Sequence, residues 1–296
     1  MVRIGGCTNE ISTYLSLIES NYPAFIQLIS KFTAHNNWNL KMKIISYNVN
    51  GIRAASTKNF FGWLQATNAD MVCLQEVKAL PAQIPEIIAL VEQLGYHHYW
   101  FPAEKKGYSG VAILSKIKPN HVEYGCGEEW IDREGRILRA DFDGFSLMSL
   151  YMPSGSSGDE RQVKKYEFMR FFDVYIGKLR NQIPNLIVSG DYNICHTAID
   201  IHNPKSNANS SGFLPEEREW MQLFLDNGFI DTFRHFNKDP HHYTWWSYRA
   251  GSRGKNLGWR IDYHLATRPM ENRLKNVRIL PDAVHSDHCP VLLELD

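Results

Sequence analysis

Hydrophobic residues follow two patterns along the chain from Lys43 onward. Short, nearly continuous apolar runs predict buried strands, and longer segments with apolar residues at helical spacing predict helices. Helices are expected over 58–68, 82–94 and about 160–180, and from Pro215. Strands are expected at Lys43–Val49, Met71–Leu74, Gly110–Leu114, Ile137–Phe142, Ser146–Tyr151, Leu186–Val188, Tyr243–Ser247, Ile261–Ala266 and Val291–Leu295. Because strands and helices alternate, we predict a layered α/β or α+β fold.

Turn and cap residues support several of these boundaries. Asp143-Gly144 predicts a hairpin turn, and Gly190 is expected to end the strand that begins at Leu186. Acidic residues directly after Pro215 suit the first turn of a helix, where the macrodipole favours negative charge. No repeat or low-complexity linker divides the chain after residue 41, so we expect a single domain over 42–296.

Residues 1–41 differ from the rest of the chain. Two apolar patches, interrupted by Pro23, are followed by the polar pair Asn36-Asn37. Chain termini are frequently not held by the fold, so we expect residues 1–41 to be an N-terminal extension outside the folded domain. Met42 stands directly before the first predicted strand and is a candidate for the natural start.

Composition indicates a globular protein of a reducing compartment. Of the 296 residues, 44% are hydrophobic and 22% charged, which is ordinary for a chain with a sizeable core. Five scattered cysteines without a Cys-x-x-Cys pair argue against disulfides or zinc and favour a cytoplasmic location. We expect no signal peptide and no membrane span. The formal net charge is zero, so a polyanionic partner must meet a local basic patch.

Asn, Asp, Glu and His residues follow or interrupt five of the apolar segments, or stand just before one. They are Asn48 and Asn50, Glu76, Asp191 and Asn193, Asp262, and the pair Asp287-His288. In layered α/β folds, ligands gather where strand ends meet, so these side chains are candidates for one site. Carboxylate and amide oxygens without cysteine suit a hard cation, Mg²⁺ or Mn²⁺, better than zinc. Glu76 is the first candidate ligand, although a carboxylate there can also cap a helix or lie on the surface.

Two pairs within this set predict catalytic chemistry. Asp191 and Asn193 project to the same side of an extended backbone and together could hold a water and take its proton. A Gly-Asp-x-Asn sequence on its own more often makes a turn. His288 could pair through one ring nitrogen with Asp262, which would keep an imidazolium available near neutral pH. Such a group can donate to a phosphate oxygen as negative charge builds.

The segment 245–260 combines aromatic and basic residues. It holds three Trp, one Tyr and four positive charges but no acidic residue, which suits a groove that tracks phosphates and stacks a base or sugar. Core tryptophans beside a solvated loop are the simpler interpretation. Further phosphate contacts are expected from Gly107–Gly110, Lys105-Lys106 and Lys164-Lys165.

A series of motifs, taken together, resembles one family. They are Asn48-x-Asn50-Gly51-x-Arg53-Ala54, Leu74-Gln75-Glu76, Gly107-Tyr108-Ser109-Gly110, Tyr151-Met152-Pro153, Gly190-Asp191-x-Asn193, Gly258-Trp259-Arg260-x-Asp262-Tyr263 and Ser286-Asp287-His288-Cys289-Pro290. From Met42 onward the chain resembles the exonuclease III type of abasic-site (AP) endonuclease, within the endonuclease/exonuclease/phosphatase superfamily. The resemblance implies a four-layer α/β (α+β) sandwich, in which two mixed β-sheets pack face to face with helices on both outer faces.

The activity implied by this resemblance is Mg²⁺-dependent hydrolysis of the phosphodiester on the 5′ side of abasic sites in duplex DNA, as in base excision repair. Removal of 3′-blocking groups and a 3′-to-5′ exodeoxyribonuclease activity are implied beside it, and Mn²⁺ is expected to substitute for Mg²⁺. The expected partner is damaged double-stranded DNA. We expect the protein to act as a monomer and not to bind a membrane.

The resemblance also implies a role for each matching residue. Asp191 would activate the attacking water, oriented by Asn193. Tyr151 would contact the scissile phosphate, and His288, backed by Asp262, would stabilise it. The implied metal-binding residues are Glu76, Asn50, Asp287, Asp191 and Asn193, with Asn48 as structural support. The implied DNA-binding residues are Arg53, Lys58, Tyr108, Asn207, Trp245, Arg249, Trp259 and Ile261. Trp245, Trp259 and Ile261 match a pocket for a flipped-out abasic sugar, which would reject normal nucleotides sterically.

Two departures leave the balance between incision and exonuclease activity open. Asn50 stands where some relatives carry Asp, and the residues expected to wedge into the duplex, Arg249 and the Ser156-Ser157 loop, vary in the family. The alternatives are a primarily 3′-to-5′ exonuclease with weak incision and a catalytically inactive DNA-binding module. Secreted DNases and lipid or inositol phosphatases share parts of the pattern but typically carry His where Tyr151 stands.

Overall fold

A computed structural model describes residues 41–296 of the chain. Within them, Met42–Leu295 form one compact unit. The extension expected over residues 1–41 lies outside the described residues, except for Lys41, and stays a prediction.

Two mixed sheets of six strands each form the centre of this unit. The first consists, in spatial order, of β11 (Leu274–Ile279), β12 (Val291–Leu295), β1 (Met42–Asn48), β2 (Met71–Gln75), β4 (Val111–Ser115) and β3 (His97–Phe101). The second consists of β5 (His121–Tyr124), β6 (Ile137–Phe142), β7 (Phe145–Tyr151), β8 (Leu186–Asp191), β10 (Asp262–Thr267) and β9 (Phe229–Asp231). Each sheet contains one parallel pair, β1–β2 and β7–β8, and all other neighbours run antiparallel.

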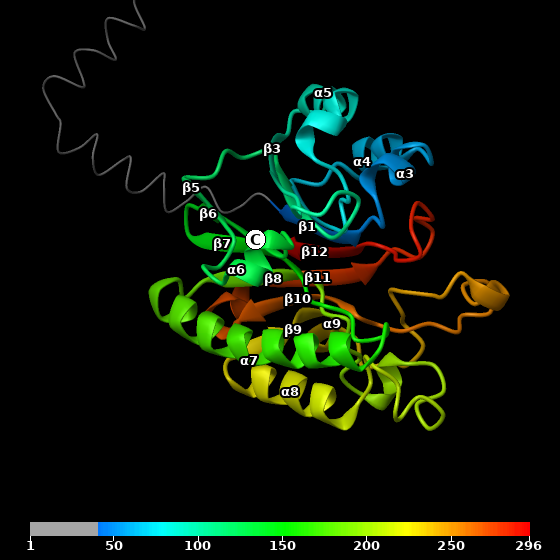
Figure 1. Ribbon diagram of the computed structural model, residues 1–296. Coiled ribbons are helices and arrows are strands. Elements are labelled where there is room, and N and C mark those ends of the chain that lie inside the picture. The colour runs from blue at the N-terminus through cyan, green and yellow to red at the C-terminus, as the bar shows by residue number, and fades with distance from the viewer. Residues whose placement is uncertain (1–40) are drawn as a thin grey trace, which may run out of the picture. The chain divides into compact units, whose positions relative to one another are not determined.

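Helices cover the outer face of each sheet (Figure 1). α4 (Phe60–Thr67), α5 (Pro85–Gln93) and the short α3 (Ile52–Ser56) pack on the first sheet. α7 (Asp159–Gln182) and α8 (Pro215–Asp226) pack on the second. Strands β1, β2 and β4 face β8, β7 and β6 across the interface between the sheets. The expected four-layer sandwich is therefore confirmed.

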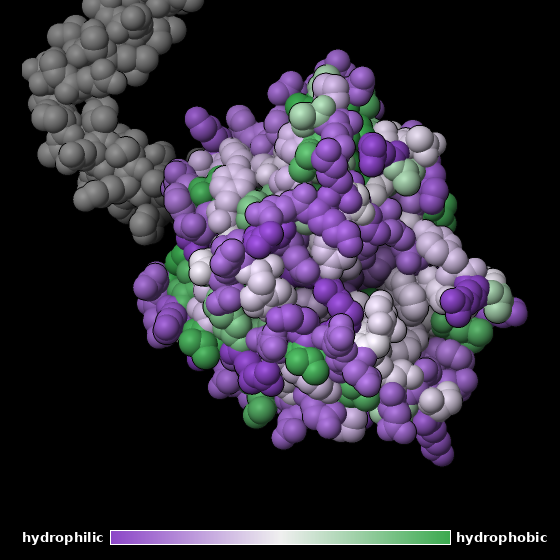
Figure 2. All heavy atoms as spheres, viewed as in Figure 1, coloured by the Kyte–Doolittle hydropathy of each residue, from purple (hydrophilic) through white to green (hydrophobic). Residues whose placement is uncertain are grey.

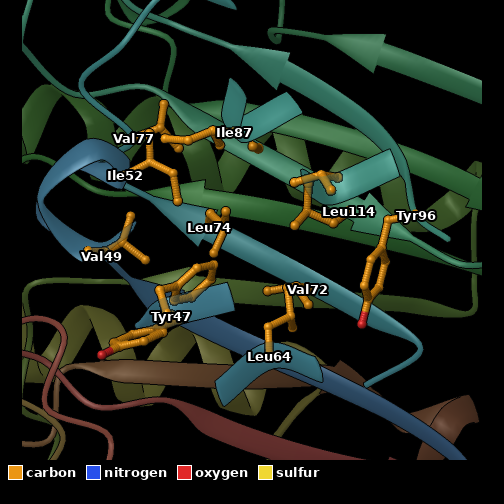
Figure 3. Packing of buried hydrophobic residues seen from close by; sticks show 14 of the residues in the cluster. Tyr47, Val49, Ile52, Leu64, Val72, Leu74, Val77, Ile87, Tyr96 and Leu114 are labelled. Carbon is orange, nitrogen blue, oxygen red and sulfur yellow. The ribbon is translucent and has the colours of Figure 1, made fainter. Parts of the chain in front are cut away.

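The alternation of side chains along the strands separates the core beneath the helices from the interface between the two sheets. Tyr47 of β1 and Leu74 of β2 point outward into the hydrophobic core beneath α4 and α5 (Figure 3). Because successive side chains of a strand point to opposite faces, the next residues, Asn48 and Gln75, face the other sheet. The site residues at these strand ends therefore lie between the two sheets.

Buried hydrogen bonds connect the sheets beneath these strand ends. Gln75 Nε2 donates to Ser149 Oγ at 3.1 Å. His264 Nε2 lies 2.9 Å from the Val291 carbonyl, and His264 Nδ1 lies 2.7 Å from Ser189 Oγ. A carbonyl only accepts, so Nε2 carries the proton and Nδ1 accepts from the serine. Burial lowers the pKa of His264 to about 4, so the ring is neutral and joins β10 to β12.

Most predicted elements are present, with one error. β6 and β12 have the predicted bounds, and α7 and α8 lie where helices are expected. The strand predicted at Tyr243–Ser247 is wrong: Trp245 forms only isolated bridges to Trp259 and His288, since the segment contacts two loops instead of following one strand. The elements without a sequence signal are α3, α6 (Glu129–Arg133), α9 (Thr232–Phe236), β3, β5, β9 and β11.

Among residues 41–296, no helix combines the length and the apolar character needed to cross a bilayer. On the face shown in Figure 2, hydrophobic residues are scattered among hydrophilic ones.

Candidate active site

The polar strand ends meet at one edge of the interface between the two sheets. In the parallel pairs, Asn48 lies beside Gln75 and Tyr151 lies beside Asp191. In the antiparallel pair of β8 with β10, Asp191 lies beside Asp262. Residues that are far apart in the sequence therefore form a single cluster.

Three residues of this cluster have left-handed backbone, which non-glycine residues seldom adopt. The φ angles of Asn50, Glu76 and Asn193 are 46°, 51° and 52°. Hydrogen bonds hold these conformations, since the Gly51 N–H donates to the Glu76 carbonyl at 2.7 Å and the Asn193 N–H donates to Asp191 Oδ1 at 2.8 Å. Such backbone concentrates at functional sites, where the surrounding fold compensates for its cost.

Asn48 and Lys78 hold Glu76 in place. Asn48 Nδ2 donates to Glu76 Oε1 at 2.8 Å and to Asp191 Oδ2 at 2.9 Å. Lys78 Nζ lies 2.6 Å from Glu76 Oε2 and donates to Asn50 Oδ1 at 2.5 Å. Burial alone would raise the pKa of Glu76, but Lys78 and the Asn48 amide hold it below its usual range. The Glu76 carboxylate is therefore ionised near neutral pH. Lys78 has no sequence signal beyond its position two residues after Glu76.

His288 is paired with Asp262, as the sequence suggests. Its Nδ1 lies 2.9 Å from Asp262 Oδ2, and its Nε2 lies 3.9 Å from Asp191 Oδ2. Burial alone would lower the pKa of His288, but Asp262, with Asp191 and Asp287, raises it to about 10. Burial and the charge of Asp262 raise the pKa of Asp191 to about 7, against the opposing effect of His288. A carboxyl group with a pKa near neutrality suits a general base.

Tyr151 contributes a protonated hydroxyl to the cluster. Burial and the charge of Glu76 raise the pKa of Tyr151 well above its ordinary value. The guanidinium of Arg136 lies 4.8 Å from the centroid of the Tyr151 ring and donates to the Tyr151 carbonyl at 2.9 Å. Arg136 is therefore a further residue that supports the site, and only its tertiary contacts reveal it.

The cluster could hold a metal ion. One ligand atom each of Glu76, Asp191 and His288 lies within 4.8 Å of the others. The carboxylate oxygens suit a hard cation, whereas a protonated imidazole is a poor ligand. The expected ligands Asn50 and Asp287 lie beside these carboxylates and are hydrogen-bonded to each other, with Asn50 Nδ2 2.9 Å from Asp287 Oδ1.

The cluster opens into a cleft of about 770 Å³. Its polar part is lined by Glu76, Tyr151, Asp191, Asn193, Asp287 and His288, and its apolar part by Leu214, Trp245, Trp259 and Ile261. The remaining lining residues come from two loops and the start of α7: Ser154, Gly155, Ser156, Gly158, Asp159, Gln162 and 209–212. The rings of Trp245 and Trp259 meet edge to face, with their centroids 6.0 Å apart. The three residues expected to form a sugar pocket therefore lie together, directly beside the polar cluster.

The other expected DNA-binding residues lie outside the lining of this cleft. They are Arg53, Lys58, Tyr108, Asn207 and Arg249. The first two and Arg249 are exposed. The Tyr108 hydroxyl accepts hydrogen bonds from Arg136 and Arg161 at 3.0 and 2.6 Å. Asn207 Nδ2 donates to two carbonyls of its own loop, both at 3.0 Å.

The phosphate contact expected for Lys165 is wrong. Lys165 lies on the inner face of α7 and has no exposed side-chain area, because its ammonium pairs with the equally buried Glu217 of α8. Two adjacent lysines in a sequence do not reveal that one of them faces the core.

Two of the four positive charges in 245–260 are also bound by groups of the protein itself. Arg260 is buried, and its Nε lies 2.7 Å from Asp200 Oδ1. Arg253 donates to four backbone carbonyls of the segment 281–288, which carries the Asp287-His288 pair. The basic charge of this segment that is available to DNA is therefore smaller than expected.

Comparisons with known proteins agree with this geometry. The model of the Endonuclease/Exonuclease/phosphatase family matches residues 45–288. An exodeoxyribonuclease of Bacillus subtilis is 42% identical over 254 residues, which cover 85% of this chain and 98% of the relative. The DNA repair nuclease APEX1 of Danio rerio is 39% identical over 267 residues, which cover 90% of this chain and 86% of the relative. The solved structure of an AP endonuclease from Archaeoglobus fulgidus matches with a TM-score of 0.78 and 30% identity, and the match covers 86% of this chain and 99% of that one.

The region matched by the family model contains every residue of the polar cluster and all of both sheets except β12 and the start of β1. Fold, cluster and sequence similarity therefore agree. The chain belongs to the endonuclease/exonuclease/phosphatase family.

Proposed function

We propose that the protein is a DNA repair nuclease that hydrolyses the phosphodiester on the 5′ side of abasic sites in duplex DNA, with Mg²⁺ as its cofactor. The observation that carries this proposal is the apolar pocket of Trp245, Trp259 and Ile261, which shares one cleft with a buried hydrolytic cluster. A sugar without a base can enter such a pocket, whereas a normal nucleotide must place its base there as well. The names of the relatives, a repair nuclease and an AP endonuclease among them, support the same substrate.

Asp191 is the residue best suited to take the proton of the attacking water. With a pKa of about 7, part of the population is ionised at neutral pH and can accept a proton. The Asn193 N–H and the Asn48 amide hold its two oxygens at 2.8 and 2.9 Å. Asn193 lines the cleft beside it, with its own Nδ2 bound to the Met152 carbonyl at 2.9 Å, and would orient the water.

His288 and Tyr151 supply hydrogen-bond donors for the phosphate. Because His288 Nδ1 is bound to Asp262, the Nε2–H of the imidazolium is left to donate to a phosphate oxygen. The raised pKa of Tyr151 keeps its hydroxyl protonated and able to donate. Donors that are held in place before the reaction stabilise the charge that builds on the phosphate in the transition state.

Glu76 is the principal residue to hold Mg²⁺, with Asp191 and Asn50 beside it. The ionised state of Glu76, maintained by Lys78 and Asn48, fits this role. A bound Mg²⁺ supplies Lewis-acid stabilisation of the phosphate and of the leaving oxygen.

A duplex with one labelled tetrahydrofuran abasic analogue tests the proposal. We expect cutting on the 5′ side of the analogue with Mg²⁺ and no cutting with EDTA, while a duplex with a normal nucleotide at that position stays intact. The analogue cannot undergo β-elimination, so a lyase would leave it uncut.

A primarily 3′-to-5′ exonuclease is the second candidate, because a relative that covers most of this chain is an exodeoxyribonuclease. Progressive shortening from the 3′ end without internal incision would favour it. Tight binding of DNA without either product would instead support the inactive binding module.

We also propose that the enzyme acts as a monomer in a reducing compartment, the cytoplasm. The four cysteines among the described residues are free, which suits such a compartment. Size-exclusion chromatography with and without the duplex tests the monomeric state. A peak at the size of a dimer would contradict it.

A further inference from the structure

A fully buried ion pair lies behind the cleft and has no part in the proposed chemistry. Lys165 of α7 and Glu217 of α8 have no exposed side-chain area, and Lys165 Nζ lies 2.5 Å from Glu217 Oε1. Burial of two charges contributes little net stability, because the cost of removing them from water offsets their attraction. Their contacts with the cleft point to another role.

The lysine contacts the loop that carries the water-activating residues. Lys165 Nζ donates to the Asn193 carbonyl at 2.7 Å. On the other side of the same residue, the Asn193 N–H donates to Asp191 Oδ1. Asn193, which has left-handed backbone, is therefore held at both its carbonyl and its N–H.

The glutamate contacts the opposite wall of the cleft. Glu217 Oε2 accepts hydrogen bonds from the N–H groups of Gly212 and Leu214 at 2.6 and 3.0 Å, and both residues line the cleft. Gly212 packs closely between the two parts, since a Cβ built on it would lie 2.9 Å from the Trp259 ring and 3.1 Å from the Asn193 carbonyl oxygen. The cleft wall at Gly212, which packs against Trp259 of the sugar pocket, thus touches the loop of Asn193 that Lys165 holds.

We propose that Lys165 and Glu217 form a positioning pair that aligns the sugar pocket with the water-activating loop. The pair touches neither the DNA nor the water. Lys165 holds the 191–195 loop, and Glu217 holds residues 210–214 of the cleft wall. The ion pair between Lys165 and Glu217 keeps these two segments at a fixed separation. This inference rests on the proposed function, because it concerns the alignment of that pocket with that cluster.

Three variants separate positioning from simple stability. Lys165→Met and Glu217→Gln each leave a buried charge without its opposite charge, so we expect both to lower Tm. The double variant Lys165→Met/Glu217→Leu leaves no buried charge without its opposite charge. We expect its Tm to lie above those of the single variants but below the wild type, because the N–H groups of Gly212 and Leu214 lose their acceptor. Exposed neighbours on the same helices provide matched controls, Lys178→Met on α7 and Glu216→Gln on α8.

The discriminating measurement is kcat and KM on the tetrahydrofuran duplex. We expect all three variants to show a kcat roughly 100-fold below the wild type, since small misplacements of reacting groups have effects of this size, with KM little changed. Both control variants should match the wild type in Tm and in kcat.

A double variant that regains kcat together with Tm would overturn the positioning role, because the pair would then serve folding alone. That result leaves the proposed function intact, since the wild type still incises the analogue. If the wild type instead only shortens 3′ ends, the proposed function fails. The kcat for 3′ shortening then tests the role of the Lys165–Glu217 pair, because Asn193 would serve the hydrolysis in that reaction as well. An unchanged kcat of the double variant in that assay also overturns the inference.

Discussion

At the residue scale, the protonation of each site residue depends on its neighbours. The Asp191 carboxyl group is buried beside Asp262 and opposite His288, and its pKa lies near neutrality. Asp262 has the same side chain but pairs with the imidazolium at 2.9 Å. In the proposed mechanism, two carboxyl groups on adjacent strands therefore have different roles, one as a base and one as a partner that keeps His288 charged.

The change Asp191→Asn tests the role of the base. It keeps the size of the side chain but removes the proton acceptor, so we expect kcat for incision to fall by about 10³-fold, within the range for loss of a general base. Affinity for the abasic duplex, measured by fluorescence anisotropy, should change only a few-fold. Asp143→Asn, in the exposed hairpin turn, is the control and should be fully active. Turnover by Asp191→Asn at the wild-type rate would exclude Asp191 as the base.

His264 gives the protein a predictable weakness in acid. Its pKa is about 4 in the folded protein and near the ordinary value of 6.5 when unfolded. Above pH 6.5, His264 is neutral in both the folded and the unfolded protein, so its protonation does not change the free energy of unfolding. As the pH falls from 6.5 to 4, only the unfolded chain takes up the proton, so the free energy of unfolding falls. The full effect is about 3 kcal/mol.

His264→Gln keeps hydrogen-bonding groups but cannot take up a proton. In urea titrations at pH 7 and pH 4, we expect the wild type to lose more of its free energy of unfolding than the variant does, by most of that 3 kcal/mol. Equal losses in the two proteins would show that His264 does not contribute.

At the element scale, the close contact of β7 with β8 explains the glycine of the Gly-Asp-x-Asn motif. The expectation that Gly190 ends the strand is wrong, because β8 continues to Asp191. A Cβ built on Gly190 would lie 1.9 Å from the Leu150 carbonyl oxygen of β7. A glycine is therefore required at position 190, because the backbone of β7 approaches closely there. The next residue is Asp191, the proposed base.

We expect Gly190→Ala to lower the free energy of unfolding by about 1–3 kcal/mol, the usual cost of added atoms in a packed interior, and to lower kcat by displacing Asp191. Gly177→Ala on α7 is the matched control, since a Cβ there meets no atom within 4 Å. The control should leave stability unchanged or raise it by up to about 1 kcal/mol. Urea unfolding and the incision assay measure both effects, and a Gly190→Ala protein as stable as the control would contradict the steric argument.

The difference between predicted and unpredicted strands follows their place in the sheets. Every strand inside a sheet corresponds to a predicted one, whereas the four edge strands, β3, β5, β9 and β11, do not. Interior strands are buried on both faces and form continuous apolar runs. Edge strands such as β5, with one partly buried and three exposed residues, are too short or too polar to show this pattern.

The same limit applies to the site. Residues at the ends of interior strands, such as Glu76 and Asp191, were predictable because a polar residue directly after an apolar run is conspicuous. Lys165 and Arg260 were placed on the DNA-facing surface because the sequence shows their charge but not their partners. Glu217 lies 52 positions from Lys165, a separation at which only the folded structure reveals the pair.

At the scale of the whole molecule, DNA binding does not depend on net charge, which is zero. Contacts with phosphates must come from local exposed groups, among which Arg249 lies at the tip of the segment that supplies Trp245 and Trp259. Because each neutralised phosphate releases counterions, log K should fall linearly with log salt. We expect Arg249→Gln to reduce the magnitude of this slope by about 1, measured by anisotropy between low and moderate salt. Lys178→Gln is the control, and an unchanged slope for Arg249→Gln would remove Arg249 from the phosphate contacts.

The pairing of β1 with β12 has a consequence for the synthesis of the protein. A ribosome produces β1 and its neighbour β2 early, but β12, the other neighbour of β1, follows only after the whole second sheet and the Asp287-His288 pair have been translated. Until then Asn48 and Glu76 have no imidazolium opposite them, and the edge of β1 is open. We therefore expect a nascent chain to be inactive until β12 has been translated.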